Sequence, residues 1–211
     1  MVGDFSLNAS LTIYTNINKR VIISKLLNVR GEYSMRIHII GGSGTGKSYL
    51  ANVLSTQYRI THYDLDNLFW DNSSDHYGVK TPVDKRDRML HDILKKESWI
   101  LEGVYYSWLD ESFEKADAIL ILDIPKRVYQ SRIIRRFIKR KLGIEQGKKE
   151  TIKSLIDLLK WTNHFQSNML PNIHSILSKY KDKVIVLDSV KKINEYISHD
   201  DLLKIINCNI K

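Results

Sequence analysis

A glycine-rich octet near residue 45 constrains the fold of this chain more than any other feature. It reads Gly41-Gly42-Ser43-Gly44-Thr45-Gly46-Lys47-Ser48 and fits the pattern G-x-x-x-x-G-K-[ST]. The apolar run 35–40 precedes it and a helical pattern follows, so the octet lies between a predicted strand and a predicted helix. In that context the backbone N–H groups form a concave nest for phosphate oxygens, to which the helix adds its positive N-terminal end.

We therefore expect the octet to bind the phosphates of a nucleoside triphosphate. Lys47 is expected to reach the β- and γ-phosphates, and the Ser48 hydroxyl is expected to ligate the accompanying Mg²⁺. A glycine-rich turn that binds no ligand is the alternative, and the flanking strand and helix favour the phosphate site. A GTPase is not favoured, because the base-reading sequence N-K-x-D is missing.

The single cysteine and the lack of long apolar runs indicate where the protein works. Cys208 has no second cysteine with which to form an intramolecular disulfide, which fits a reducing cytosol. No run approaches the length of a membrane span, and the N-terminus lacks the pattern of a signal peptide. We expect a cytoplasmic protein with one domain over 35–211, preceded by an extension over 1–34 of unknown role. The sequence does not indicate the oligomeric state.

Strand and helix patterns alternate from residue 36 onward. Strands are predicted near 36–40, 60–63, 99–101, 118–122 and 184–187, and helices at 47–57, 82–96, 125–141, 151–162, 171–180 and the C-terminal end. This alternation predicts an α/β fold of the three-layer phosphate-loop NTPase kind: a five-stranded parallel sheet with helices on both faces. The basic helix that runs into a glycine-flanked stretch also predicts a helical lid at about 136–151.

Acidic residues follow three of the predicted strands. Asp64 and Asp66 come after the second strand, Glu102 ends the third, and Asp123 follows the fourth. Ligands of open parallel sheets bind beyond the carboxyl ends of the strands, where carboxylates suit Mg²⁺ coordination or the orientation of a phosphoryl acceptor. A helix cap or a turn former is the alternative for each of them, and it stays fully open for Asp123.

Positive charge is concentrated in one segment of the chain. Residues 126–160 hold twelve lysines and arginines against three carboxylates, an excess equal to the formal charge of +9 of the whole chain. Arg132 and Arg136 lie four residues apart, hence on one helix face, where bound phosphates would relieve their repulsion. Two alternatives remain: a solvated basic face, or a nucleic-acid surface on a regulator that uses ATP as a switch. The second is less favoured because no aromatic residues interleave the basic ones.

Taken together, the motifs resemble those of adenylate-kinase-like phosphate-loop kinases, in the subgroup labelled DNA topology modulation proteins. The resemblance spans about residues 35–197. Its matching segments are the octet, His62-Tyr63-Asp64-Leu65-Asp66-Asn67-Leu68-Phe69-Trp70, Trp99-Ile100-Leu101-Glu102-Gly103-Val104-Tyr105, Leu122-Asp123-Ile124-Pro125 with Arg132 and Arg136 behind it, and Lys160-Trp161 with Phe165.

This resemblance implies a kinase that uses ATP and Mg²⁺, of the nucleoside-monophosphate-kinase-like class, acting on a small-molecule acceptor. By this resemblance, Arg132 and Arg136 bind the phosphates of ATP and take part in catalysis with Lys47 and Asp66. Asp66 also binds the acceptor, together with Asp64, Trp70 and Tyr105. Glu102 holds Mg²⁺ through water. Core packing is the alternative role for the two aromatic residues.

The chain departs from that family at three points. Glu102 stands where relatives usually carry aspartate, and no arginine follows Arg140. The adenylate kinase sequence Asp-Gly-Phe-Pro-Arg is absent at 102–106, which argues against AMP as the acceptor. The alternative function is an ATP-binding, DNA-associated regulator with weak ATPase activity.

Overall fold

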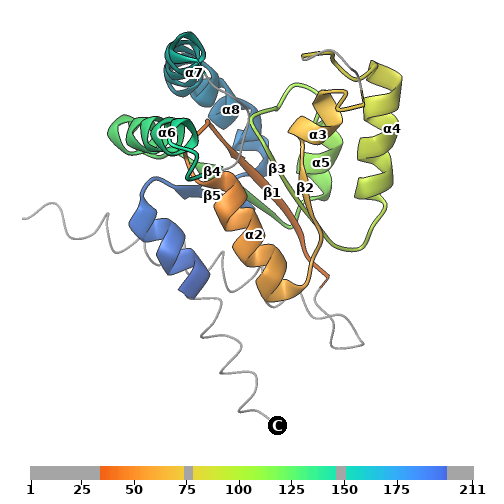
Figure 1. The fold of residues 1–211 in the computed structure, drawn as a ribbon. Helices are drawn as coiled ribbons and strands as arrows, with labels where there is room; N and C mark the ends of the chain where they lie inside the picture. The colour runs from red at the N-terminus through yellow and green to blue at the C-terminus, as the bar shows by residue number, and fades with distance from the viewer. Residues whose placement is uncertain (1–33, 74–77, 146–150, 199–211) are drawn as a thin grey trace, which may run out of the picture.

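The structure is a computed structural model, and it describes residues 34–73, 78–145 and 151–198 (Figure 1). Its strands are β1 (Arg36–Gly41), β2 (His62–Asp64), β3 (Trp99–Gly103), β4 (Ala118–Leu122) and β5 (Val184–Leu187). All four pairings are parallel, and the strand order is β2-β3-β1-β4-β5. The predicted five-stranded parallel sheet is therefore confirmed, with β1 at its centre.

Helices connect the strands. They are α2 (Lys47–Tyr58), α3 (Asp66–Phe69), α4 (Val83–Leu94), α5 (Asp110–Lys115), α6 (Lys126–Lys141), α7 (Ile152–His164), a π-helix (Phe165–Met169), α8 (Leu170–Leu177), a 3₁₀-helix (Ser178–Tyr180) and a helix over 190–198. Within the described ranges, no helix combines the length and the apolar character needed to cross a bilayer.

Both faces of the sheet are covered, which makes three layers (Figure 1). On one face Leu50 of α2 and Ile193 of the 190–198 helix pack against Ile37 of β1. On the other face Phe113 of α5 and Ile173 of α8 belong to the core cluster that includes the sheet. Every residue of β3 and β4 is buried, as expected for continuous apolar strands in a parallel sheet covered on both sides. The predicted three-layer α/β arrangement, with helices on both faces of the sheet, is confirmed.

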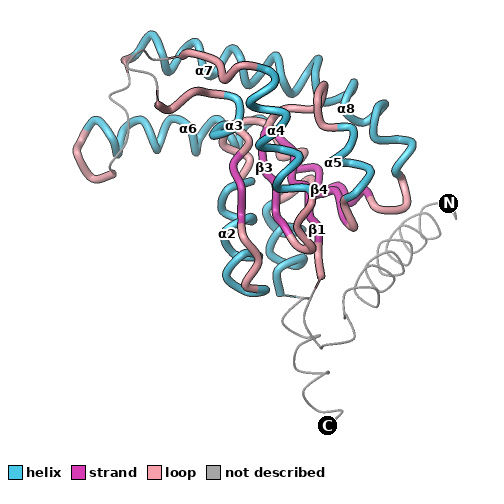
Figure 2. Tube along the Cα trace, turned by 90° about the vertical axis from the view of Figure 1, so that its right-hand side faces the viewer, coloured by secondary structure: helices cyan, strands magenta, loops and turns pink. Residues whose placement is uncertain are grey.

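Two long helices, α6 and α7, run side by side at the end of the sheet where the strands terminate (Figure 2). Pro125 precedes α6, where its fixed φ suits a helix start. A capping box starts α7: Thr151 Oγ1 accepts a hydrogen bond from Ser154 N at 3.1 Å, and Ser154 Oγ accepts one from Thr151 N at 2.8 Å. Part of the predicted lid, 146–150, lies outside the described residues, as does almost all of the predicted extension 1–34.

Candidate active site

The octet turns tightly after β1 because two of its glycines have left-handed backbone conformations. Gly44 has φ 76° and Gly46 has φ 106°. A Cβ on Gly44 would lie 2.8 Å from the Tyr129 carbonyl oxygen, so only glycine fits there. Gly46 is the N-cap of α2 and no side chain caps it, so the first N–H groups of α2 point toward the place where an anion would bind.

Side chains hold the loop in shape from within and from α6. Thr45 Oγ1 donates to the Gly42 carbonyl at 2.8 Å, and Lys47 Nζ donates to the same oxygen at 3.1 Å. Arg132 Nη1 of α6 donates to the Thr45 carbonyl at 3.0 Å. These bonds place the Lys47 ammonium over the loop and bring the basic helix against it.

The two predicted phosphate-binding arginines face the same side of α6. Arg132 and Arg136 both line the pocket beside the octet, whereas Arg135 and Lys139 are exposed and do not line it. Among the described residues, Arg136 Nε is buried with no hydrogen-bond partner. A guanidinium with unused donors beside a phosphate loop suits phosphate oxygens, which accept two bonds from one fork.

Glu102 at the end of β3 connects the octet to the neighbouring strand β2. Ser48 Oγ donates to Glu102 Oε1 at 2.6 Å, Lys47 Nζ lies 3.9 Å from Oε2, and His62 Nε2 lies 3.7 Å from Oε1. Burial alone would raise the pKa of Glu102, but the nearby His62 ring, the charge of Lys47 and the hydrogen bond from Ser48 outweigh it and lower the pKa. Burial lowers the pKa of Lys47, and the nearby Glu102 carboxylate opposes that shift.

The donor set at this point fits Mg²⁺. Ser48 and Glu102 present hard oxygen atoms beside the loop, 2.6 Å apart. Nowhere in the described parts of the chain do three or more His, Cys, Asp or Glu side chains gather into a group that could hold a metal ion by itself. Mg²⁺ commonly takes one or two protein oxygens and completes its shell with water and substrate phosphates, so a pair of ligands is sufficient.

Asp64 and Asp66 lie across the pocket from the octet. Asp66 N donates to Asp64 Oδ1 at 2.9 Å, and Tyr105 Oη donates to Asp66 Oδ1 at 2.8 Å. Burial raises the pKa of Asp64, the backbone bond from Asp66 opposes this, and the carboxylates of Glu102 and Asp66 add to the rise. Burial and the hydrogen bond to Asp66 also raise the pKa of Tyr105, so its hydroxyl stays a donor. Asp66 itself is exposed to the pocket.

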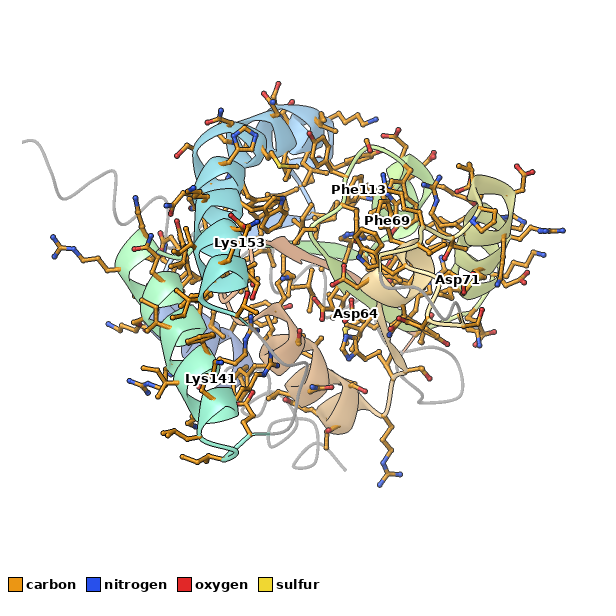
Figure 3. The ribbon with its side chains drawn as sticks, turned by 45° about the horizontal axis from the view of Figure 1, so that its top comes forward. Asp64, Phe69, Asp71, Phe113, Lys141 and Lys153 are labelled. Atoms are coloured by element: carbon orange, nitrogen blue, oxygen red, sulfur yellow. The ribbon has the colours of Figure 1, made fainter. Side chains whose placement is uncertain are left out.

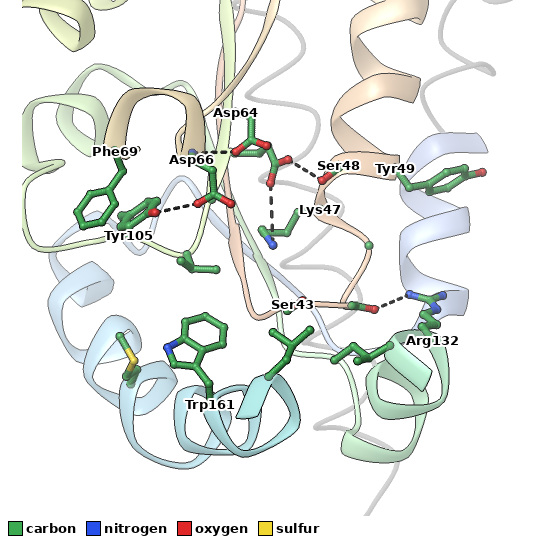
Figure 4. A pocket seen from close by; sticks show the side chains of 18 of the residues that line it. Ser43, Lys47, Ser48, Tyr49, Asp64, Asp66, Phe69, Tyr105, Arg132 and Trp161 are labelled. Atoms are coloured by element: carbon green, nitrogen blue, oxygen red, sulfur yellow. Dashed lines mark hydrogen bonds and ion pairs between the residues drawn. The ribbon is translucent and has the colours of Figure 1, made fainter. Parts of the chain in front are cut away.

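Aromatic rings surround Asp66 (Figure 4). The rings of Phe69 and Tyr105 stack with centroids 4.6 Å apart, and Trp70 meets Phe69 edge-on at 4.9 Å. Figure 4 shows Trp161 of α7 across the pocket from Phe69 and Tyr105. Trp70 is 36 % exposed and Trp161 38 %, so neither is a core residue.

One pocket of about 1100 Å³ joins the octet to this aromatic side. The predicted site residues that line it are Ser43, Gly44, Gly46, Lys47, Ser48, Asp64, Asp66, Trp70, Glu102, Tyr105, Arg132 and Arg136. Gly41, Gly42 and Thr45 belong to the loop but are not among the lining residues. Asp123 is not among them either: it accepts a hydrogen bond from Gln166 and so ties the end of β4 to the π-helix.

Some residues at the pocket had no role predicted from the sequence, among them His62, Phe69, Lys80 and Trp161. The position of His62 could have been predicted from the sequence: it lies two residues before Asp64 on β2, and residues two apart on a strand point to the same face. Phe69 adjoins the predicted Trp70, but its stacking on Tyr105 depends on the arrangement of the strands. Trp161 lies in a segment that matches the resemblance, which implied no role for it, and nothing in the local sequence marks Lys80. Both reach the pocket from other elements.

No family model matches the chain. It is 34 % identical over 105 residues to an uncharacterized protein of Bacillus subtilis (strain 168), YqaC, a match that covers 49 % of this chain and 57 % of that protein. The chain therefore spans less than two thirds of the length of this relative.

Several solved structures match the chain at low similarity. A gluconokinase from Sinorhizobium meliloti 1021 is 14 % identical with a TM-score of 0.47, covering 79 % of this chain and 89 % of that one. A shikimate kinase from Bacteroides thetaiotaomicron is 14 % identical with a TM-score of 0.46, covering 81 % and 98 %. A sugar kinase from Janibacter sp. HTCC2649 is 15 % identical with a TM-score of 0.44, covering 81 % and 93 %. Similarity at this level does not assign an activity to the chain.

Proposed function

We propose that this protein is an ATP-dependent phosphotransferase of the nucleoside-monophosphate-kinase-like class that acts on a small-molecule acceptor. One observation carries the proposal: a single pocket holds a phosphate loop on one side and an exposed carboxylate, Asp66, on the other. A phosphoryl group held by the loop would therefore face a group able to orient an acceptor hydroxyl.

The loop half of the pocket would bind and neutralise the nucleotide phosphates. Backbone N–H groups of the octet, the Lys47 ammonium and the Arg132 and Arg136 guanidinium groups all converge there. Such preorganised donors stabilise the charge on the transferred phosphoryl group without rearranging during the reaction. Ser48 and Glu102 would hold Mg²⁺, which when bound supplies further charge neutralisation at the β- and γ-phosphates.

On the other side, Asp66 would accept a hydrogen bond from the acceptor hydroxyl and take up its proton. Tyr105 donates to one oxygen of Asp66 and so leaves the other oxygen for the acceptor. Because Asp66 is exposed, it can pass the proton on to water after transfer.

The test follows the γ-phosphate of labelled ATP in the presence of a pool of small metabolites. We expect label in an organic phosphate with the wild type and at least about 10²-fold less with Asp66→Asn, because general-base steps contribute factors of that size. Asp92→Asn, an exposed carboxylate on α4 outside the pocket, is the matched control and should behave like the wild type. Label in inorganic phosphate alone, for all three proteins, would contradict phosphotransfer.

A second candidate function rests on the outer surface of α6 and α7. Arg135, Lys139 and Lys141 of α6 are exposed, and Figure 3 shows Lys141 on α6 and Lys153 on α7, to the left of Asp64 and Phe69. Such a surface favours non-specific contact with nucleic-acid phosphates. A DNA-associated ATPase would bind DNA at low salt with affinity that falls steeply as salt rises. No binding at low salt would eliminate this candidate.

A further inference from the structure

The acceptor side of the pocket differs in chemical character from the loop side. We define the acceptor half by its lining residues Asp64, Asp66, Phe69, Trp70, Lys80 and Tyr105. These supply two carboxylates, three aromatic rings and one ammonium group. The loop side, by contrast, holds Lys47 and the two arginines of α6. The inference below rests on the proposed function and concerns the acceptor alone.

The three rings form a partly exposed aromatic wall. Phe69 lies between its two neighbours, stacked on Tyr105 at 4.6 Å and edge-on to Trp70 at 4.9 Å. Trp161 faces this wall from α7 (Figure 4). Planar rings, including nucleobases, bind such surfaces by stacking, and an acyclic or purely aliphatic compound gains nothing from it.

Arginine is missing from the acceptor half, although enzymes that bind phosphate or carboxylate commonly use it. The chain holds two arginines between Asp66 and Tyr105, Arg86 and Arg88, and both are engaged elsewhere. Arg86 Nη2 donates to Asp87 Oδ1 at 2.7 Å, and its guanidinium lies 4.3 Å from the ring centre of Trp108. Arg88 Nε donates to the Asp84 carbonyl at 3.1 Å. Neither lines the pocket.

Lys80, the one cationic side chain among the lining residues of the acceptor half, would bind an anionic group only weakly. Lys80 Nζ lies 5.4 Å from the ring centre of Phe69, at the exposed rim of the wall. A lysine at such a site acts only as a hydrated point charge. An anionic group on the acceptor would meanwhile approach Asp64 and Asp66, with Glu102 behind them, and like charges at close range repel strongly.

From this arrangement we propose that the acceptor is an uncharged hydroxyl compound with a planar ring, of which nucleosides are the common class, and that nucleoside monophosphates are rejected. The ring stacks against the exposed part of the cluster formed by Phe69, Trp70 and Tyr105, and the hydroxyl donates to Asp66. The hydroxyl oxygen bonds to the γ-phosphorus while the bond from that phosphorus to the β,γ-bridging oxygen breaks. ADP leaves with the bonding electrons, and the hydroxyl proton passes to Asp66.

The experiment compares matched acceptors by the rate of ADP release from MgATP. The pairs are adenosine with AMP, guanosine with GMP, cytidine with CMP and thymidine with TMP, and ribose serves as an uncharged compound without a planar ring. We expect one or more nucleosides to raise ADP release at least about tenfold above both the basal rate and the rate with the matching monophosphate. The product should be that nucleoside carrying one new phosphate, identified by mass.

Two variants test the ring wall directly. Phe69→Leu and Trp70→Leu should each raise the KM for the nucleoside about tenfold, because stacking is lost, while the affinity for MgATP stays as in the wild type. Tyr180→Leu removes an aromatic ring outside the pocket and is the matched control. Thermal melting of each variant identifies any that fails to fold.

Several results would overturn the inference. These are faster turnover with monophosphates, turnover with ribose alone, or ring variants that match the control in KM. Failure of every compound to stimulate ADP release would also overturn it, provided that MgATP still protects the protein against thermal unfolding. Loss of that protection would instead overturn the proposed function, so the two failures are distinguishable.

Discussion

Two glycines with similar backbone angles provide a matched pair for testing the phosphate loop. Gly44 has φ 76° and Gly143 has φ 70°, so alanine at either position adopts a left-handed conformation that costs about 1–2 kcal/mol. At Gly44 the added Cβ would also meet the Tyr129 carbonyl oxygen at 2.8 Å, whereas at Gly143 no described atom lies within 4 Å. Gly44→Ala should therefore lower the melting temperature more than Gly143→Ala.

Only Gly44→Ala should also abolish the binding of MgATP, because the loop must shift to relieve the clash. Thermal unfolding with and without MgATP measures both effects. Equal destabilisation by the two substitutions, or full MgATP binding by Gly44→Ala, would show that the loop does not have the shape described above.

The ionisation of Glu102 in the pocket makes the stability of the folded protein depend on pH in the acidic range. Its pKa in the folded protein lies below its ordinary value of 4.5, so it stabilises the fold above that pH and loses this contribution as pH falls through the lower folded-state pKa. At neutral pH Glu102→Gln should cost on the order of 1–3 kcal/mol, because Lys47 loses its counter-charge. Melting temperatures measured from neutral to acidic pH should fall less in Glu102→Gln than in the wild type.

Glu114→Gln, an exposed substitution on α5 outside the pocket, is the control for this series. It should follow the wild-type curve across the same pH range. A Glu102→Gln protein that loses stability in acid as steeply as the wild type would mean that Glu102 has no ionised partner in the folded state.

Individual site residues were predictable where a local pattern marked them. The octet has a motif, and Asp64, Asp66 and Glu102 lie at or just after strand ends. The structure brings these carboxylates and most of the octet to one pocket; Gly41, Gly42 and Thr45 do not line it. The stacking of Phe69 on Tyr105 was not predictable, because the residues lie far apart in sequence and meet only when β2 pairs with β3. The hydrogen bond from Gln166 to Asp123 could not be predicted either, because these residues are also far apart in sequence.

On α6, the two neighbouring residues Arg135 and Arg136 differ clearly in whether they reach the pocket. Arg136 lines the pocket with Nε buried, whereas Arg135 is exposed and does not line it. Arg136→Ala should reduce ATP turnover by about 10²-fold, the size typical for loss of one donor to a transition-state charge. Arg135→Ala, one residue away with the same charge change, should leave turnover at the wild-type level in steady-state measurements of ADP release.

The same pair separates the two candidate functions. If the outer face of α6 binds nucleic acid, Arg135→Ala weakens DNA binding at low salt and Arg136→Ala does not. Equal loss of turnover in both variants would contradict the assignment of Arg136 to the phosphates.

The strands and the long helices were predicted within one to three residues of their observed ends, and the short helices were not. The helices at 47–57 and 125–141 and all five strands were confirmed. The elements α3 and α5 have four and six residues, fewer than two helical turns, so no hydrophobic period could mark them. The helices predicted at 151–162 and 171–180 are present as α7 and α8, and a π-helix that was not predicted joins them, with Phe165 buried beside Gly42.

At the scale of the whole molecule, cationic and anionic side chains come to different sides of one pocket. The basic segment 126–160 supplies the arginines on the loop side, and the end of β2 with the residues after it supplies Asp64 and Asp66 on the other. Glu102 at the end of β3 lies against Ser48 of the loop. Parallel pairing explains this, because it gathers the carboxyl ends of all strands at one edge of the sheet. The sequence could predict the sheet and this edge, but the way in which α6 and α7 face the edge depends on packing between distant segments.

The most direct test of the nucleotide site is calorimetric titration of the full chain with MgATP, accompanied by thermal unfolding. We predict binding of one nucleotide per chain, and stabilisation of about 2.7 kcal/mol when MgATP is at 100 times its dissociation constant. Lys47→Ala should weaken binding at least about tenfold, a loss of 1.4 kcal/mol, while Lys181→Ala, an exposed lysine outside the pocket, should bind as the wild type does. The absence of both heat and thermal protection in the wild type would contradict the account.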